Sequence, residues 1–307
     1  MGKEKRMAKE LKGLMPPMIT VFKEGEAFDE ERTRRHVEFL IKNGVQGLIP
    51  CGSTGEFAAM TMDERKKVAE VVVDEVNGRI PVYIGTGHYS TKIAIDLSKH
   101  AEKIEADGVM VIAPYYLIPT EREICEHYRS IAKSISIPLM IYNNVWFAGV
   151  ELSVKTIAKL SKEGIVSSVK LAHGDPSRVH DLKYYCGNDL VVFYGHDVCA
   201  LEGLAAKADG WIAGIGNLIP EHCRKLCDLL LVDKDLDKAN DHWLTMLPLL
   251  HMCVNKKNGE RPDWLQIIKK GLEMRGQPVG EGKRPILPIT KEDERKLRAE
   301  LTKMGLI

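Results

Sequence analysis

The 307-residue sequence carries almost no net charge and has no long apolar run. Its 44 Lys and Arg residues nearly balance 43 Asp and Glu residues, which leaves a formal net charge of +1. This balance does not suggest nucleic acid or an anionic membrane as a partner. No apolar stretch approaches the roughly 20 residues that a membrane-spanning helix needs. We therefore expect a globular protein with neither nucleic acid nor a membrane as partner.

The sequence also lacks the features of a secreted protein. Its basic first dozen residues are not followed by the apolar segment of a signal peptide. The seven cysteines are odd in number and form no paired framework, which is typical of reduced thiols. We expect a cytoplasmic location, and we interpret residues 1–13 as an N-terminal extension.

Several motifs of common enzyme classes are missing. No complete Gly-x-Gly-x-x-Gly dinucleotide fingerprint, no Walker phosphate-binding loop and no Gly-x-Ser-x-Gly nucleophile motif is present. Cys223 and Cys227 lie four residues apart next to His222, but no second ligand pair has matching spacing, so we expect both thiols to face the core. We predict neither a metal nor a cofactor.

Short apolar segments alternate with amphipathic segments along most of the chain. Near-continuous apolar strands separated by helices indicate a parallel sheet covered by helices. Eight such units favour a (β/α)8 TIM barrel, and an open doubly wound sheet is the alternative that the missing dinucleotide fingerprint disfavours. The predicted strands are 14–22, 44–51, 81–87, 108–116, 138–144, 165–172, 190–197 and 210–217.

The chain beyond residue 218 shows only helical patterns. Apolar residues recur at spacings of three and four, which is typical of amphipathic helices. We therefore divide the chain into the extension 1–13, a catalytic (β/α)8 barrel over 14–218 and a C-terminal helical region over 219–307. The predicted helices of that region are 220–232, 235–253, 262–275 and 290–304.

The strand 165–172 contains a lysine inside an apolar segment. Period-2 alternation puts Val166, Ser168 and Lys170 on one face of this strand. Burial disfavours the charged form of a lysine, and a neutral amine can form a Schiff base with a ketone. The alternative is a lysine whose aliphatic stem covers apolar surface while its amine reaches water.

Polar residues also follow other predicted strands, at the ends where β/α barrels carry their chemistry. The run 52–56, Gly-Ser-Thr-Gly-Glu, offers two hydroxyls and free backbone N–H groups that suit a carboxylate. A plain βα turn that uses glycine for backbone freedom is the alternative. Tyr142 ends the fifth strand, where its hydroxyl could transfer protons or simply reach water.

Together these motifs resemble the dihydrodipicolinate synthase and N-acetylneuraminate lyase family of class I, Schiff-base lyases. The resemblance covers about residues 14–307 and depends on four motifs in order. They are Gly52-Ser-Thr-Gly-Glu56, Pro114-Tyr-Tyr116, Tyr142-Asn143 and Val169-Lys170. The resemblance implies a TIM barrel that acts on a 2-oxo acid such as pyruvate.

The resemblance also implies roles for individual residues. Lys170 would form the Schiff base, and Tyr142 would shuttle protons. Ser53 and Thr54 would hold the carboxylate of the 2-oxo acid. Tyr116 would reach across a tight dimer into the neighbouring site and complete a hydroxyl relay through Ser53 to Tyr142.

Two further positions match residues that line the pocket next to the lysine in this family, namely Gly195 and Ile212. The family is usually a dimer of dimers, which implies a homodimer or homotetramer. Schiff-base chemistry fixes the enamine intermediate but not the overall reaction. A pyruvate-dependent aldolase and a 2-keto-3-deoxy sugar acid aldolase or dehydratase both fit, and a catalytically idle 2-oxo-acid-binding barrel is the alternative from another class.

One position departs from dihydrodipicolinate synthase itself, which remains an alternative. That enzyme has an arginine five residues after the strand-five tyrosine, where it binds the carboxylate of aspartate semialdehyde. Here the position holds Phe147. A carboxylate needs a charge-assisted partner, and a phenyl ring offers none. We therefore predict weak or no synthase activity with aspartate semialdehyde.

Overall fold

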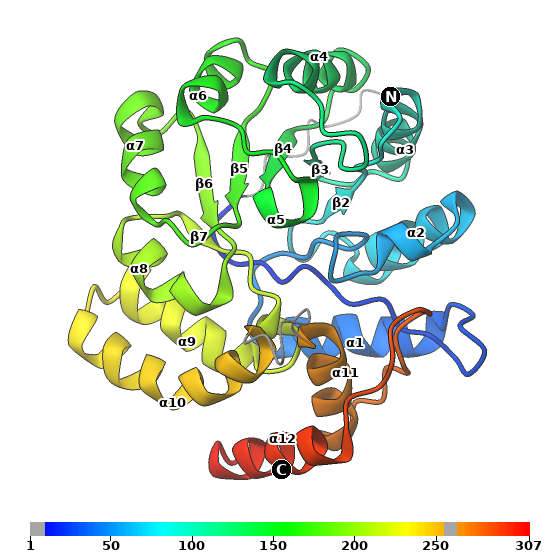
Figure 1. Ribbon diagram of the computed structural model, residues 1–307, viewed down its shortest axis with the longest axis vertical. Coiled ribbons are helices and arrows are strands. Elements are labelled where there is room, and N and C mark those ends of the chain that lie inside the picture. The colour runs from blue at the N-terminus through cyan, green and yellow to red at the C-terminus, as the bar shows by residue number, and fades with distance from the viewer. Residues whose placement is uncertain (1–9, 255–262) are drawn as a thin grey trace.

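The structure is a computed structural model that describes residues 10–254 and 263–307. Its centre is a curled, seven-stranded, all-parallel sheet in the order β1-β7-β6-β5-β4-β3-β2, with helices around its outside (Figure 1). The strands are β1 (Gly13–Leu14), β2 (Tyr83–Gly85), β3 (Gly108–Ile112), β4 (Leu139–Asn143), β5 (Ser168–Leu171), β6 (Val191–Tyr194) and β7 (Gly210–Trp211).

The predicted strand 44–51 is wrong as a regular strand, because only one isolated parallel bridge, Leu48 to Val82, forms there. Of the predicted strand 14–22, only the first residue belongs to a regular strand, β1 (Gly13–Leu14). Both segments contain prolines, and Pro16, Pro17 and Pro50 have no N–H with which to extend a regular ladder. Seven regular strands therefore stand where we predicted eight.

The irregular segment 46–50 still closes the barrel, because its backbone forms hydrogen bonds on both sides. These bonds bridge the gap between β1 and β2 at the two edges of the sheet. On the side of β1, Gln46 N donates to Leu14 O at 2.7 Å, and Ile49 N donates to Pro16 O at 3.1 Å. On the side of β2, Leu48 N donates to Pro81 O at 2.9 Å, and Tyr83 N donates to Leu48 O at 3.0 Å.

Side chains cap several of the helices around the sheet. Asp29 accepts a hydrogen bond at the start of α1, while Thr61 and Thr120 form capping boxes at α2 and α4. One short helix after β4, α5 (Val145–Ala148), was not predicted. The others are α1 (Glu30–Lys42), α2 (Met62–Val76), α3 (Thr91–Lys103), α4 (Glu121–Ala132), α6 (Val154–Lys162), α7 (Ser177–Cys186), α8 (Ala200–Ala205) and α9 (Pro220–Leu231).

Three further helices form the predicted C-terminal appendage, beside α9 and away from β2–β5 (Figure 1). They are α10 (Leu236–Val254), α11 (Trp264–Met274) and α12 (Lys291–Lys303). Of the predicted helix 262–275, residue 262 lies outside the described residues, as do residues 1–9 of the N-terminal extension. The division into 1–13, 14–218 and 219–307 stays a prediction, although α9 packs against β1 and β7.

Two observations on the described residues bear on the expected partners. Cys223 and Cys227 are buried on α9, so the prediction that they face the core is confirmed. Among the helices of residues 10–254 and 263–307, none has the length and apolar character that crossing a membrane requires.

We predict that stability falls as the pH falls from 7 to 5, partly through His36. This side chain is 2% exposed, and burial lowers its pKa to about 4. The unfolded chain, with a pKa of about 6.5, binds more protons between these values, so protonation favours unfolding. One such histidine costs on the order of 2 kcal/mol of folding free energy at pH 5. Urea denaturation at a series of pH values measures this.

The variant His36→Gln removes the linked proton and should flatten the dependence of unfolding free energy on pH. The exposed His251, replaced in the same way, is the control and should leave that dependence unchanged. An identical pH slope for wild type and His36→Gln would contradict the prediction, whatever the absolute stability of the variant.

Candidate active site

Lys170 lies within β5, and its side chain points into a crowded interior. The residue is only 4% exposed, so its amine does not reach open water. In the register of β4 and β5, Tyr142 is the direct neighbour of Lys170. The lysine Nζ lies 4.3 Å from the centroid of the Tyr142 ring. An amine and a phenol are thus held together by strand pairing.

Gly195, which follows β6, makes room for this lysine. A Cβ atom at Gly195 would lie 2.4 Å from Cε and 2.8 Å from Cγ of Lys170, much closer than carbon atoms can approach. Any side chain at this position would displace the lysine stem. The structure therefore places Gly195 directly beside Lys170.

The hydroxyl of Tyr142 is held by a residue that the sequence did not single out. Asn144 Nδ2 donates to the Tyr142 hydroxyl at 2.8 Å, and Asn144 Oδ1 accepts from the backbone N of Phe147 at 2.9 Å. Asn144 is the N-cap of α5, a position where asparagine is common. One side chain therefore fixes both the phenol and the start of the loop that carries Phe147.

Asp197 is a second residue that the sequence did not assign. Its carboxylate accepts from the backbone N of Gly214 at 3.1 Å and of Ile215 at 2.9 Å. Burial raises the pKa of Asp197, and the positive charge of Lys170 opposes this rise. The carboxylate holds the turn after β7, next to the buried Ile212.

The run 52–56 forms a tight turn at the carboxyl end of the sheet. Gly55 N donates to Gly52 O at 3.0 Å, and Glu56 N donates to Ser53 O at 3.0 Å. Thr54 is buried, whereas Ser53 is partly exposed. Thr20 Oγ1 donates to Gly55 O at 2.7 Å and ties the turn to the segment after β1.

A buried ion pair holds this turn from the C-terminal helices. The Nζ atom of Lys269 in α11 lies 2.7 Å from Oε1 of Glu56. The other carboxylate oxygen, Oε2, accepts a hydrogen bond from the backbone N of Lys283 at 2.7 Å. Lys269 also donates to the carbonyls of Thr20 and Glu281, each at 3.0 Å. Burial lowers the pKa of Lys269, and the attraction of Glu56 opposes this shift.

A cavity of about 310 Å³ opens beside this turn, and both Ser53 and Phe147 line it. Tyr116, by contrast, is 82% exposed and contacts Tyr89 edge to face, with ring centroids 6.5 Å apart. The structure thus groups Lys170, Tyr142 and Gly195, places Ser53 and Phe147 on the wall of one cavity, and leaves Tyr116 on the surface.

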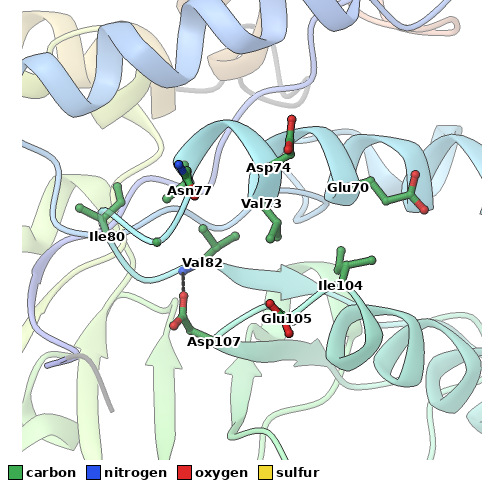
Figure 2. Close-up of a pocket in the computed structure, with 11 residues that line it drawn as sticks. Glu70, Val73, Asp74, Asn77, Ile80, Val82, Ile104, Glu105 and Asp107 are labelled. Carbon is green, nitrogen blue, oxygen red and sulfur yellow. Dashed lines mark hydrogen bonds between the residues drawn. The ribbon is translucent and has the colours of Figure 1, made fainter. Parts of the chain in front are cut away.

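A different cavity, of about 340 Å³, lies at the opposite end of the strands (Figure 2). Its lining includes Val82 and Asp107, which stand just before β2 and β3. Asp107 Oδ2 accepts from Val82 N at 2.9 Å, so the carboxylate ties the strand starts together. β/α barrels carry their catalytic sites at the carboxyl ends of the strands, so this cavity is not the active site.

Comparisons with known proteins agree with the fold and the motifs. The model of the dihydrodipicolinate synthetase family matches residues 10–304. A 4-hydroxy-tetrahydrodipicolinate synthase of Syntrophobacter fumaroxidans is 36% identical over 296 residues, which are 96% of this chain and 99% of the relative.

Solved structures give the same result. Dihydrodipicolinate synthase from Aquifex aeolicus is 31% identical with a TM-score of 0.90, covering 96% of this chain and 99% of that one. A second structure is that of YagE, a prophage protein of the dihydrodipicolinic acid synthase family from Escherichia coli K12, in complex with pyruvate. It is 28% identical with a TM-score of 0.88, and the match covers 96% of this chain and 99% of YagE. The predicted barrel with its C-terminal helices is confirmed, and the chain belongs to the dihydrodipicolinate synthetase family of class I lyases, which act through a lysine Schiff base.

Proposed function

We propose that Lys170 forms a Schiff base with a 2-oxo acid such as pyruvate, and that the chain makes or breaks a bond at the adjacent carbon. The observation that carries this proposal is the buried amine of Lys170, 4.3 Å from the centroid of the Tyr142 ring, with Gly195 leaving space for its stem. The presence of pyruvate in the related Escherichia coli structure supports the choice of substrate.

The chemistry follows from these groups. The amine of Lys170 attacks the ketone carbon, water leaves, and the resulting iminium withdraws electrons from the neighbouring carbon. Loss of a proton there gives an enamine. The Tyr142 hydroxyl, held by Asn144 Nδ2, donates and accepts the protons that these steps require.

The carboxylate of the 2-oxo acid would bind at the turn 52–56. In this proposal the hydroxyls of Ser53 and Thr54, with nearby backbone N–H groups, hold it. Gly195 and Ile212 line the space beside the lysine. No metal or other cofactor takes part in these steps, and we propose a cytoplasmic enzyme.

The exposed Tyr116 suggests that the site is completed by a second subunit. A tyrosine that is 82% exposed beside another exposed tyrosine suits an interface better than open solvent. We therefore propose a homodimer, or a homotetramer built from two such dimers, in which Tyr116 of one subunit enters the other site and relays protons through Ser53 to Tyr142.

The names of the relatives favour a second candidate, 4-hydroxy-tetrahydrodipicolinate synthase, which condenses pyruvate with aspartate semialdehyde. Against it stands Phe147, which is half exposed at the position where the synthase has its arginine. A pyruvate-dependent aldolase or a 2-keto-3-deoxy sugar acid aldolase or dehydratase therefore has the stronger support.

We predict that pyruvate with sodium borohydride labels Lys170 irreversibly. Reduction of the Schiff base should leave a pyruvyl-derived group on the peptide that contains this residue, as mass spectrometry detects. Lys170→Ala should abolish the label, whereas alanine at the exposed Lys92 should not. No label on the wild type, or a label only on other lysines, would instead favour an idle barrel that binds 2-oxo acids.

Replacing Tyr142 with phenylalanine should slow turnover by roughly 10²–10⁴-fold, the range for loss of a general acid or base. The fold should survive, because only a hydroxyl is removed. Steady-state kinetics of pyruvate release measures the effect, and the exposed Tyr184→Phe is the matched control. A rate for Tyr142→Phe within a few-fold of the wild type would remove Tyr142 from the mechanism.

Mixing Tyr116→Phe and Lys170→Ala proteins should restore part of the activity that each lacks alone. Hybrid dimers would contain one site with both an intact Lys170 and an intact partner Tyr116. Native mass spectrometry verifies the exchange of subunits. Absence of recovery after verified exchange would show that the site is not shared.

A further inference from the structure

We propose that the cavity beside Ser53 binds an apolar side chain of the second substrate, so that the carbonyl compound joined to or released from the enamine is an apolar, for example aromatic, aldehyde. This inference rests on the proposed Schiff-base function and names the substrate class for the same site.

The cavity has about 310 Å³ and an almost wholly apolar wall. Its sides come from the 3-10 helix η1 (Phe57–Ala59), the end of β3, the helix α5, the start of α11 and the segment before α12. An apolar cavity of roughly 150 Å³ is enough to bind benzene, so a phenyl ring with a short chain fits this volume. The lining residues are Ser53, Glu56, Phe57, Ala58, Ala59, Ile112, Tyr115, Phe147, Trp264, Leu265 and Ile286.

Among these lining residues Glu56 alone carries a charge, and that charge is already engaged. One of its oxygens lies 2.7 Å from Lys269 Nζ, and the other accepts from Lys283 N. Its side chain is buried, so it offers a substrate little surface. A carboxylate or phosphate entering the cavity would meet no partner of opposite charge on this wall, and burying it unpaired would be costly.

The two lysines behind the wall are engaged as well. Lys269 Nζ contacts Glu56 and two backbone carbonyls, which uses its three donors. Lys283 Nζ donates to Glu64 at 2.8 Å. The guanidinium of Arg65 lies 5.0 Å from the Phe57 ring centroid, and its Nη2 donates to the carbonyls of Gly85 and Gly87, whereas its buried Nε and Nη1 form no hydrogen bond with the residues that the structure describes. Arg65 does not line the cavity, so the wall that a substrate would meet is apolar although cations lie behind it.

Phe147, which lines the cavity, is connected to the reacting Tyr142 through Asn144. Asn144 holds the Tyr142 hydroxyl with one atom of its amide and the backbone of Phe147 with the other. An aldehyde whose oxygen faces the Tyr142 hydroxyl can therefore direct its substituent toward the Phe147 ring.

The reaction balances without any further reactant. Condensation of Lys170 with pyruvate forms a C=N bond and releases one water. The iminium then loses a methyl proton, which Tyr142 accepts, and becomes the enamine. The enamine carbon forms a bond to the aldehyde carbon, the C=O double bond becomes a single bond, and Tyr142 returns the proton to the aldehyde oxygen. Addition of one water to the iminium frees Lys170 and releases a 4-hydroxy-2-oxo acid. Cleavage of such an acid is the reverse sequence.

The test separates this inference from the Schiff-base proposal by measuring two steps. Exchange of the methyl protons of pyruvate in D2O, followed by NMR, reports enamine formation without any second substrate. The value of kcat/KM is then measured for benzaldehyde, glyceraldehyde and aspartate semialdehyde at saturating pyruvate. We expect exchange to occur and benzaldehyde to be preferred over both others by at least about 10-fold, the lower end of what an apolar pocket discriminates.

Preference for glyceraldehyde or aspartate semialdehyde, with normal exchange, would overturn the apolar-aldehyde inference and leave the Schiff-base proposal standing. A kcat/KM near roughly 10⁴ M⁻¹s⁻¹ or above with aspartate semialdehyde would identify the synthase. Absence of exchange in the wild type would instead overturn the Schiff-base proposal, and with it this inference.

Variants of the cavity wall test whether this wall sets the preference between aldehydes. Ile286→Gln puts an amide into the wall and should lower the ratio of benzaldehyde to glyceraldehyde kcat/KM by about 10-fold. Leu287→Gln is the matched control, because this neighbour is exposed and does not line the cavity. Equal ratios in both variants and the wild type would contradict the inference.

A second variant covers the case in which Ile286→Gln does not fold. Phe147→Arg changes a half-exposed side chain and supplies the cation that the wall lacks. It should raise kcat/KM for aspartate semialdehyde relative to benzaldehyde by at least about 10-fold, since arginine binds a carboxylate through paired hydrogen bonds. No change in this ratio would mean that substrates do not contact this wall.

Discussion

The buried ion pair of Glu56 and Lys269 is the interaction on which the arrangement of the site depends. It fastens the turn 52–56, which carries Ser53 and Thr54, to α11, and Lys269 also binds the carbonyl of Thr20. Removing one partner of such a pair costs roughly 3–5 kcal/mol, because the other charge is left buried and unpaired. The C-terminal helices are therefore a structural support of the proposed active site.

Strand register provides the second constraint. β4 and β5 place Tyr142 next to Lys170, and the end of β6 supplies the glycine that lets the lysine stem pass. Because the pairing of β4 with β5 sets the positions of both residues, no loop is needed to bring the amine of Lys170 next to the phenol of Tyr142. The loop residue Asn144 adds only the direction of the hydroxyl.

The local patterns of the sequence predicted most of the barrel but not its long-range contacts. Apolar periodicity located the C-terminal helices α9 to α12 within a few residues of their ends. The segment 44–51 was mistaken for a regular strand because its apolar character outweighed its proline. No local pattern could reveal that Glu56 pairs with Lys269, since the two residues meet only when the barrel has closed and α11 has packed on it.

The site separates its chemistry from its choice of substrate. Lys170, Tyr142 and Gly195 lie on or next to strands, whereas the apolar cavity takes only Ile112 from a strand and is otherwise built from loops, η1, α5 and the start of α11. Loops on a barrel tolerate change better than strands do, so relatives can keep the enamine and still differ in the second substrate. Replacing an arginine by Phe147 at the mouth of such a cavity removes the partner for a charged aldehyde and extends an apolar wall. In the function that we propose, membership of the family sets the intermediate, and the cavity selects what that intermediate attacks.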